Sequence, residues 1–387
     1  MSKETGLQSV IPIDLGASYR AHKAEIDRAI QGVLDKGWYI LGQEVTAFEE
    51  EFAKYIGVRH GIGVANGTDA LHVALRAGGI RPGDSVITVS HTAVATVAAV
   101  ELAGAIPILV DIDPQSYTMD PTRLKDTLRD IDTAPRSRKN SRPKAVVVVH
   151  LYGQPADMPA IIELARQYDL LVVEDCAQAH GSTLAAKKAG TWGSIAAFSF
   201  YPTKNLGAFG DGGAVVTNDP KLAERVRLLR EYGWKERYIS QVAGFNTRLD
   251  ELQAAILRVK LKSLDAENIQ RRKIGDIYDT ALAKCQHVAA PWRNPDAKHI
   301  FHQYVVRTKR RDSLREFLKK QAIGALIHYP RPVHLQPAYM GRIGQGSGGL
   351  SKTELACREV LSMPIYGQIS ESQAEYVAEQ IVRWDSQ

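Results

Sequence analysis

Two patterns of apolar residues follow one another along this chain. Short continuous apolar runs, such as those at 145–150, 171–173 and 195–200, are typical of strands buried on both faces of a sheet. Longer segments carry apolar residues at helical spacing, as in 19–36 and 44–55. Because the two patterns alternate, we expect an α/β fold with a mostly parallel central sheet covered by helices.

The chain changes character near residue 250. A long amphipathic pattern begins at Leu249, and we expect it to link a large domain at 1–250 to a smaller C-terminal α/β domain at 251–387. Within that second part the pattern predicts a strand at 302–308, a helix at 312–321, a flexible loop at 341–350 and two amphipathic helices at the end.

Composition is that of a globular protein. The 387 residues are 44% hydrophobic and 24% charged, which suits one large and one smaller domain. No apolar run is long enough to cross a membrane, and the first ten residues have no apolar signal core, so we expect a cytoplasmic protein. The three cysteines lack metal or disulfide spacing, and a net charge of +6 fits an anionic ligand better than nucleic acid.

Acidic and basic side chains follow two of the predicted strands. Glu174 and Asp175 end one run, and Lys204 lies in the turn after another. Ligands of open α/β sheets bind at such strand ends. Pyridoxal phosphate needs a lysine amine to form an imine and an anion to keep its pyridine nitrogen protonated. Asp175 could instead cap a helix starting near Ala177, and Lys204 could be a solvated lysine, but the pair favours pyridoxal phosphate.

A strand at 60–64 runs into a turn that contains Gly67 and Thr68 and then into a helix. A helix start offers free amide donors for a phosphate, although a plain helix cap would have the same sequence. No G-x-G-x-x-G pattern lies between a strand and a helix, which argues against a nicotinamide enzyme.

Several longer motifs resemble the DegT/StrS nucleotide-sugar aminotransferases, a fold type I branch of the pyridoxal phosphate enzymes. They are EDCAQAHG, FSFYPTKNLGAFGDGGAVVTND, YGWKERY, GFNTRLDELQAAIL and HYPRPVHLQPAY, in the family's order. The resemblance extends from about residue 11 to the end of the chain.

The resemblance implies a role for individual residues. Lys204 would be the catalytic residue and would bind the cofactor together with Gly67, Thr68, Asp175, Gln178, Ser199 and Asn246. Asn246 would reach the partner's cofactor phosphate, which requires a homodimer with shared active sites. Substrate contacts would come from Tyr232, Arg248, His328, Tyr329 and His334, and no metal is implied.

The implied reaction is transamination with L-glutamate as amino donor and a nucleotide-linked keto sugar as acceptor. Tyr232 stands where enzymes that aminate carbon 4 more often carry histidine, so a dTDP-3-keto-6-deoxyhexose is favoured. A 4-keto sugar and an inosose-type cyclitol remain alternatives. A sugar dehydratase would carry histidine at Lys204, and a non-catalytic regulatory protein would be expected to have lost Lys204, Asp175 or Gln178.

The chain departs from the family in two places. Many relatives place an aromatic residue after the threonine of the turn at 90–93, where it stacks on the cofactor ring, whereas this chain has Ala93 after Thr92. We consider His91 a candidate to cover the ring instead. The basic segment 129–144 is longer than usual in the family, and we expect an exposed insertion.

Overall fold

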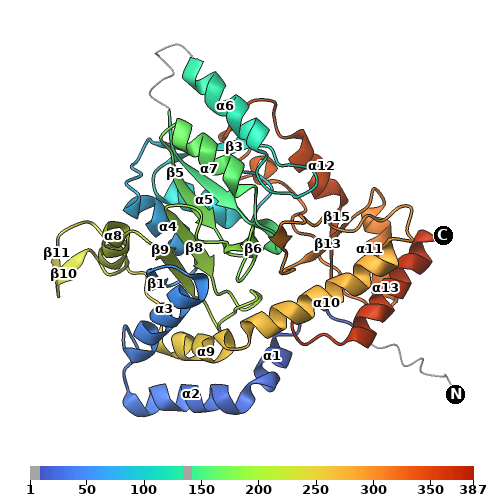
Figure 1. The fold of residues 1–387 in the computed structure, drawn as a ribbon, viewed down its shortest axis with the longest axis horizontal. Coiled ribbons are helices and arrows are strands. Elements are labelled where there is room, and N and C mark those ends of the chain that lie inside the picture. The colour runs from blue at the N-terminus through green and yellow to red at the C-terminus, as the bar shows by residue number, and fades with distance from the viewer. Residues whose placement is uncertain (1–8, 134–141) are drawn as a thin grey trace.

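The computed structural model describes residues 9–133 and 142–387. Its centre is an eight-stranded sheet in the order β1-β9-β8-β5-β4-β2-β3-β14 (Figure 1). All strands but β9 run in the same direction, as predicted for a mostly parallel sheet. The strands are β1 His60–Val64, β2 Ser85–Val89, β3 Ile106–Val110, β4 Pro143–Val149, β5 Leu171–Asp175, β8 Ile195–Ser199, β9 Gly213–Thr217 and β14 Gly344–Gln345.

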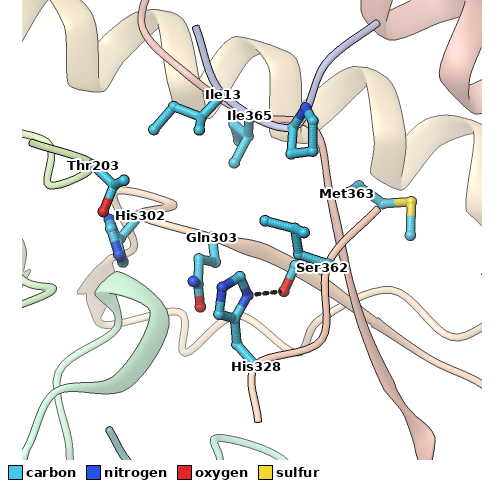
Figure 2. A pocket seen from close by; sticks show the side chains of 10 residues that line it. Ile13, Thr203, His302, Gln303, His328, Ser362, Met363 and Ile365 are labelled. Atoms are coloured by element: carbon cyan, nitrogen blue, oxygen red, sulfur yellow. Dashed lines mark hydrogen bonds between the residues drawn. The ribbon is translucent and has the colours of Figure 1, made fainter. Parts of the chain in front are cut away.

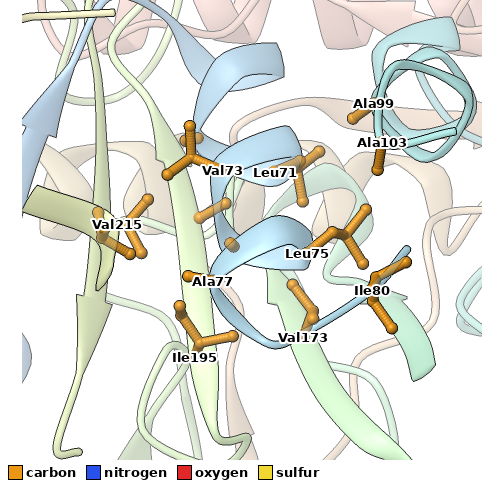
Figure 3. Packing of buried hydrophobic residues seen from close by; sticks show 14 of the residues in the cluster. Leu71, Val73, Leu75, Ala77, Ile80, Ala99, Ala103, Val173, Ile195 and Val215 are labelled. Atoms are coloured by element: carbon orange, nitrogen blue, oxygen red, sulfur yellow. The ribbon is translucent and has the colours of Figure 1, made fainter. Parts of the chain in front are cut away.

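Helices cover both faces of this sheet. Along β4, Ala145 and Val147 pack on one face while Val146 and Val148 pack on the other, because successive side chains of a strand point to opposite sides. The first face is covered by α4 Gly67–Ala77 and α5 Val94–Leu102 (Figure 3), and also by α8 Pro220–Arg230. The second face is covered by α6 Pro121–Thr133, α7 Met158–Gln167 and α12 Ser351–Glu359.

The N-terminal helices lie along the edge of the molecule. The predicted helix at 19–36 is two helices, α1 Leu15–Ala21 and α2 Lys23–Lys36, with His22 between them. Gly37 ends α2 in the left-handed conformation (φ 64°), as its sequence position indicates. α3 Gln43–Ile56 packs Phe48 and Phe52 under the sheet, and α9 Glu251–Leu261 lies beside α2 and α3.

A separate apolar cluster organises the C-terminal part. It contains residues of α10 Leu264–Leu282, α11 Arg311–Lys320, α13 Glu371–Asp385, β13 Tyr304–Arg307 and β15 Val360–Met363. Val10 and Ile13 also pack there, so the N-terminal segment joins this cluster. The predicted boundary at residue 250 stays a prediction.

One prediction for the C-terminal part is wrong, while the two helices predicted at its end are present as α12 and α13. Residues 344–345 form β14, an edge strand beside β3, although the glycine-rich segment 341–350 predicted a flexible loop. The backbone of this segment pairs with β3, and one of the bonds runs from Gly346 N to Leu109 O at 2.7 Å. A glycine-rich sequence does not predict such pairing. The last two helices are separated by β15, which is buried and pairs with β13.

Short elements complete the description. They are β6 Thr183–Leu184, β7 Lys187–Lys188, β10 Trp234–Glu236, β11 Ile239–Ser240, β12 Ala297–Lys298 and the 3-10 turns η2 Leu151–Gly153 and η3 Val333–Leu335. The β10–β11 hairpin projects from the molecule beside α8 (Figure 1). Half of the predicted insertion at 129–144, residues 134–141, lies outside the described residues. Every helix within 9–133 and 142–387 is too short or too polar to span a lipid bilayer.

Candidate active site

A cavity of about 290 Å³ lies where β5 and β8 end and α4 begins. Five segments of the sequence form its walls: the start of α4, the end of β4 at Val149, and the stretches after β2, after β5 and after β8. Among the predicted residues, Gly67, Thr68, Asp175, Gln178, Ser199 and Lys204 all line it. The structure therefore brings together on one cavity six residues from three separate stretches of the sequence.

Asp175 is the buried carboxylate of this cavity. Thr96 donates its hydroxyl hydrogen to Asp175 Oδ2 at 2.8 Å, and the Ala177 amide donates to Oδ1 at 3.2 Å. Because the Thr96 hydrogen is used in this way, Thr92 donates to Thr96, 2.9 Å away. Burial raises the pKa of Asp175, while Thr96, the Ala177 amide and Lys204 oppose that rise. Residues 177–182 form turns, so Asp175 does not cap a helix there.

Glu174 precedes Asp175 but faces the opposite side of the sheet. Its carboxylate accepts hydrogen bonds from the amides of Gly190, Trp192 and Gly193 at 2.7–2.8 Å. His150 donates from Nε2 at 2.9 Å, because its Nδ1 accepts from the Ala156 amide. Glu174, His150 and Cys176 are close enough to hold a metal ion, but these bonds already occupy the Glu174 oxygens and both His150 nitrogens. Glu174 is therefore a structural residue.

Lys204 is the cation of the cavity. It lies in the turn after β8, where its amide donates to Tyr201 O at 2.8 Å. Burial lowers the pKa of Lys204 to about 8, and the Asp175 charge opposes this shift. A large fraction of its amine is thus neutral near pH 8 and can act as a nucleophile or a base.

The start of α4 forms the third wall. Asn66 caps the helix by accepting from the Asp69 amide at 2.8 Å. The amides of a first helical turn lack partners within the helix, and they carry its positive dipole end. Ser199 lies against Gly67 so closely that a Cβ at residue 67 would come within 2.5 Å of the Ser199 Cβ. This close approach requires glycine at residue 67 and produces a cradle suited to a phosphate.

Gln178 links the cavity to the segment Leu326–Leu335. Its Oε1 accepts from the Tyr152 amide at 2.7 Å, and its Nε2 donates to the Tyr329 hydroxyl at 3.1 Å. Burial raises the pKa of Tyr329 to about 12, so this hydroxyl stays protonated at neutral pH.

His328 and His334, in the same segment, have other contacts. His328 lines a second, smaller cavity of about 90 Å³ next to Thr203 and His302, and its Nδ1 is 2.8 Å from Ser362 Oγ (Figure 2). His334 is buried, with Nδ1 2.8 Å from Ser90 Oγ and Nε2 3.3 Å from Glu354. Neither histidine is on the wall of the Asp175 cavity.

The residues predicted around 232–248 also lie outside that cavity. Tyr232 is 38% exposed and packs on Trp234 with ring centres 5.0 Å apart. Asn246 is exposed, and Arg248 is half-buried. Within one subunit, therefore, these side chains do not join Lys204, and the structure leaves their predicted roles open.

His91 does not occupy the position predicted for it. It is completely buried among Tyr117, Tyr152 and Tyr329, while Thr92 and Ala93 line the cavity. Its ring packs among these three tyrosines and is not on the cavity wall. Its candidacy as the cover of a cofactor ring is therefore not supported by its position.

Some cavity residues were missed by the sequence reasoning, chiefly Thr96, Tyr201 and Asp211. Thr96 lies in an apolar helical segment with no motif to mark it. Its place after β2 is the one indication, since loops at the carboxyl ends of neighbouring parallel strands converge.

Comparison with known proteins agrees with this geometry. The model of the DegT/DnrJ/EryC1/StrS aminotransferase family matches residues 20–382. The chain is 45% identical over 384 residues to dTDP-3-amino-3,4,6-trideoxy-alpha-D-glucose transaminase of Streptomyces venezuelae, covering 99% of this chain and 98% of that protein. It is 44% identical to dTDP-3-amino-3,6-dideoxy-alpha-D-galactopyranose transaminase of Aneurinibacillus thermoaerophilus, covering 96% and 98%.

A solved structure shows the same fold. The crystal structure of S. venezuelae DesV in complex with a ketimine intermediate matches with a TM-score of 0.92 at 46% identity, covering 98% of this chain and 99% of that one. The predicted fold class and the resemblance are thereby confirmed. On these matches and on the cavity that holds Asp175 and Lys204, the chain belongs to the DegT/DnrJ/EryC1/StrS aminotransferase family.

Proposed function

We propose that this protein is a pyridoxal phosphate-dependent aminotransferase that transfers the amino group of L-glutamate to a nucleotide-linked keto sugar. The favoured acceptor is a dTDP-3-keto-6-deoxyhexose, because two close relatives are named as dTDP-3-amino sugar transaminases. The observation that carries the proposal is the meeting of Asp175 and Lys204, 29 residues apart in the chain, on one cavity with the start of α4.

The residues of the cavity fit the cofactor. The cradle formed by Gly67, Thr68 and Ser199 suits its phosphate, since a Cβ at residue 67 would fill the space. The Asp175 carboxylate suits a protonated pyridine nitrogen, and Gln178, which lines the cavity, would offer an amide hydrogen to the ring hydroxyl. When bound, pyridoxal phosphate supplies an electron-withdrawing ring that stabilises a carbanion.

Lys204 would hold and move the proton of the reaction. Its Nζ would bind the cofactor covalently in the resting protein. Once free, the same amine would move a proton between the donor's alpha carbon and the cofactor. A pKa of about 8 suits both directions near neutral pH, since the amine can accept and release a proton.

The acceptor would be bound partly by residues away from the Asp175 cavity. We propose Tyr232, Arg248, His328, Tyr329 and His334 as contacts to the nucleotide sugar. A net charge of +6 agrees with an anionic diphosphate ligand.

A homodimer would complete the site. Asn246 is exposed and absent from its own subunit's cavity, which fits a role in the partner's cofactor site. Exposed apolar side chains, including Trp38 at 63% and Tyr238 at 72%, offer surface to bury against a second copy. Mixing two inactive variants, Lys204→Ala and Asn246→Asp, should restore activity, since hybrid dimers would contain one intact site; no recovery after subunit exchange would exclude a shared site.

A spectroscopic titration tests the reaction. We expect the protein loaded with pyridoxal phosphate to show a visible absorption band that disappears with L-glutamate and returns with a dTDP-3-keto-6-deoxyhexose. If the band returns only with a 4-keto sugar or an inosose, the protein is still an aminotransferase, but its acceptor is not the one proposed. If the protein never forms the band, the proposed pyridoxal phosphate-dependent activity is disproved.

A further inference from the structure

A buried chain of hydrogen bonds connects α12 to the loop that carries Tyr329. Cys357 Sγ lies 3.4 Å from His91 Nδ1, and His91 Nε2 lies 2.8 Å from the Tyr152 hydroxyl. Tyr152 in turn donates this hydroxyl to the backbone carbonyl of His328. Cys357, His91 and Tyr152 are at most 3% exposed, so no water competes for these groups.

The last bond of the chain fixes the direction of all the others. A carbonyl oxygen can only accept, so the single hydroxyl hydrogen of Tyr152 points to His328. His91 must therefore donate from Nε2, and its Nδ1 must accept from the Cys357 thiol. Burial lowers the pKa of His91 to about 4, which keeps the ring in the neutral form that this arrangement needs.

The backbone of Tyr152 orients Gln178. An amide N–H can only donate, so the bond from Tyr152 N at 2.7 Å identifies the facing Gln178 atom as Oε1. The Gln178 Nε2 hydrogens are thereby directed to Tyr329 and the cavity. Tyr152 adopts a left-handed conformation (φ 60°, ψ 0°) to make this contact, a strained one for a bulky residue.

Both ends of Tyr152 thus act on one pair of side chains, Gln178 on the cavity wall and Tyr329, which Gln178 contacts. Its amide determines which edge of Gln178 faces the cavity, and its hydroxyl holds the carbonyl that precedes Tyr329, the acceptor of the Gln178 Nε2 bond. The Gln303 amide closes the arrangement by donating to the Tyr152 carbonyl at 3.2 Å.

We propose that Tyr152 is a positioning residue of the active site, which orients Gln178 and anchors Tyr329, and that His91 keeps its hydroxyl directed to His328. The inference rests on the proposed function only in assigning Gln178 to cofactor binding and Tyr329 to the nucleotide sugar. It gives His91 a role that does not require contact with the cofactor.

The first test compares Tyr152→Phe with Tyr117→Phe. Tyr117 is a matched control, since its buried ring is centred 5.8 Å from the rings of both His91 and Tyr152. We expect Tyr152→Phe to weaken pyridoxal phosphate binding about tenfold, because the hydroxyl bonds to His328 and His91 are lost, and to shift the pH midpoint of the visible band. Tyr117→Phe should change neither. Unchanged affinity and midpoint in a folded Tyr152→Phe protein would overturn the proposal.

A second measurement requires no cofactor. Nitrogen-15 chemical shifts of His91 in the cofactor-free protein should show a neutral ring protonated at Nε2, with Nδ1 accepting, throughout pH 6–8. Cys357→Ser keeps a donor to Nδ1 and should keep this tautomer. A ring protonated at Nδ1 would refute the chain of bonds, even where Tyr152→Phe does not fold. If the wild type shows no visible band but His91 has the expected tautomer, the proposed reaction fails and the anchoring of the His328 loop remains.

Discussion

The Asp175 cavity and the segment Leu326–Leu335 both carry the polar residues expected of a binding site, but they use them differently. In the cavity, the Lys204 amine and the amides of Gly67 and Thr68 have no partner among the described residues, and hydrogen bonds serve mainly to position Asp175. In Leu326–Leu335, His334 is held by Ser90 and Glu354, and His328 by Ser362. A polar residue is thus a stronger candidate for function when its structure leaves it without an internal partner.

The largest expected effect is that of Lys204→Ala. We expect the visible band to be absent and kcat/KM to fall by about 10³–10⁴-fold or more, because nucleophile and base are lost together. Lys260→Met is the matched control: Lys260 is also buried with its pKa lowered to about 8, but it donates to Gly207 O. If the Lys204→Ala protein keeps the band, another lysine must form the imine with the cofactor.

The pH dependence of cofactor capture should follow Lys204. Only the neutral amine reacts, so the rate should rise with pH and be half-maximal near pH 8. With an ordinary lysine pKa of about 10.5, the reactive fraction at pH 7 would be about 300-fold smaller. Stopped-flow absorbance of the cofactor-free protein mixed with pyridoxal phosphate measures this, and a midpoint above pH 10 would contradict the lowered pKa.

Asp175→Asn and Glu174→Gln separate chemistry from stability on one strand. We expect Asp175→Asn to lower kcat by about 100-fold, since an amide cannot hold the pyridine nitrogen protonated. Glu174→Gln should instead lower the unfolding free energy by about 2–3 kcal/mol, because an amide NH₂ would face other donors. Chemical denaturation and steady-state kinetics distinguish the two, and equal effects of both variants on kcat would break the distinction.

Thr96→Val should have a moderate effect. Valine has a similar shape but removes the hydrogen bond to Asp175, which costs about tenfold in kcat/KM. That bond lowers the pKa of Asp175, so its loss raises the pKa and moves the acid side of the pH–rate profile to higher pH. An unmoved profile would show that Thr96 does not influence the carboxylate.

His334→Asn should have the smallest effect on substrate binding. Since both ring nitrogens already have partners, we expect KM for the sugar to change less than about threefold while the melting temperature falls. A tenfold rise in KM with unchanged melting temperature would show that His334 is a principal contact to the sugar rather than the weakest of the proposed ones.

The sequence was most informative where a motif and a strand end coincide. The parallel sheet, most helices and the candidate residues on the walls of the cavity could all be predicted, because apolar periodicity and the ends of β5 and β8 are local properties. Thr96 and Tyr152 could not, because their roles come from contacts with residues 79 and 26 positions away. The pairing of β14 with β3 was missed for the same reason, since it joins segments more than 200 residues apart.

By itself, then, the sequence determined the fold class, the family resemblance and the identity of the Asp175–Lys204 pair. Tertiary structure decided which polar groups remain free. Glu174 and Asp175 are adjacent and chemically alike, yet the alternation of β5 sends one into a closed network of amides and the other to the cavity. His91 illustrates the same point, because only the packing of three tyrosines shows that its ring is turned away from the cavity.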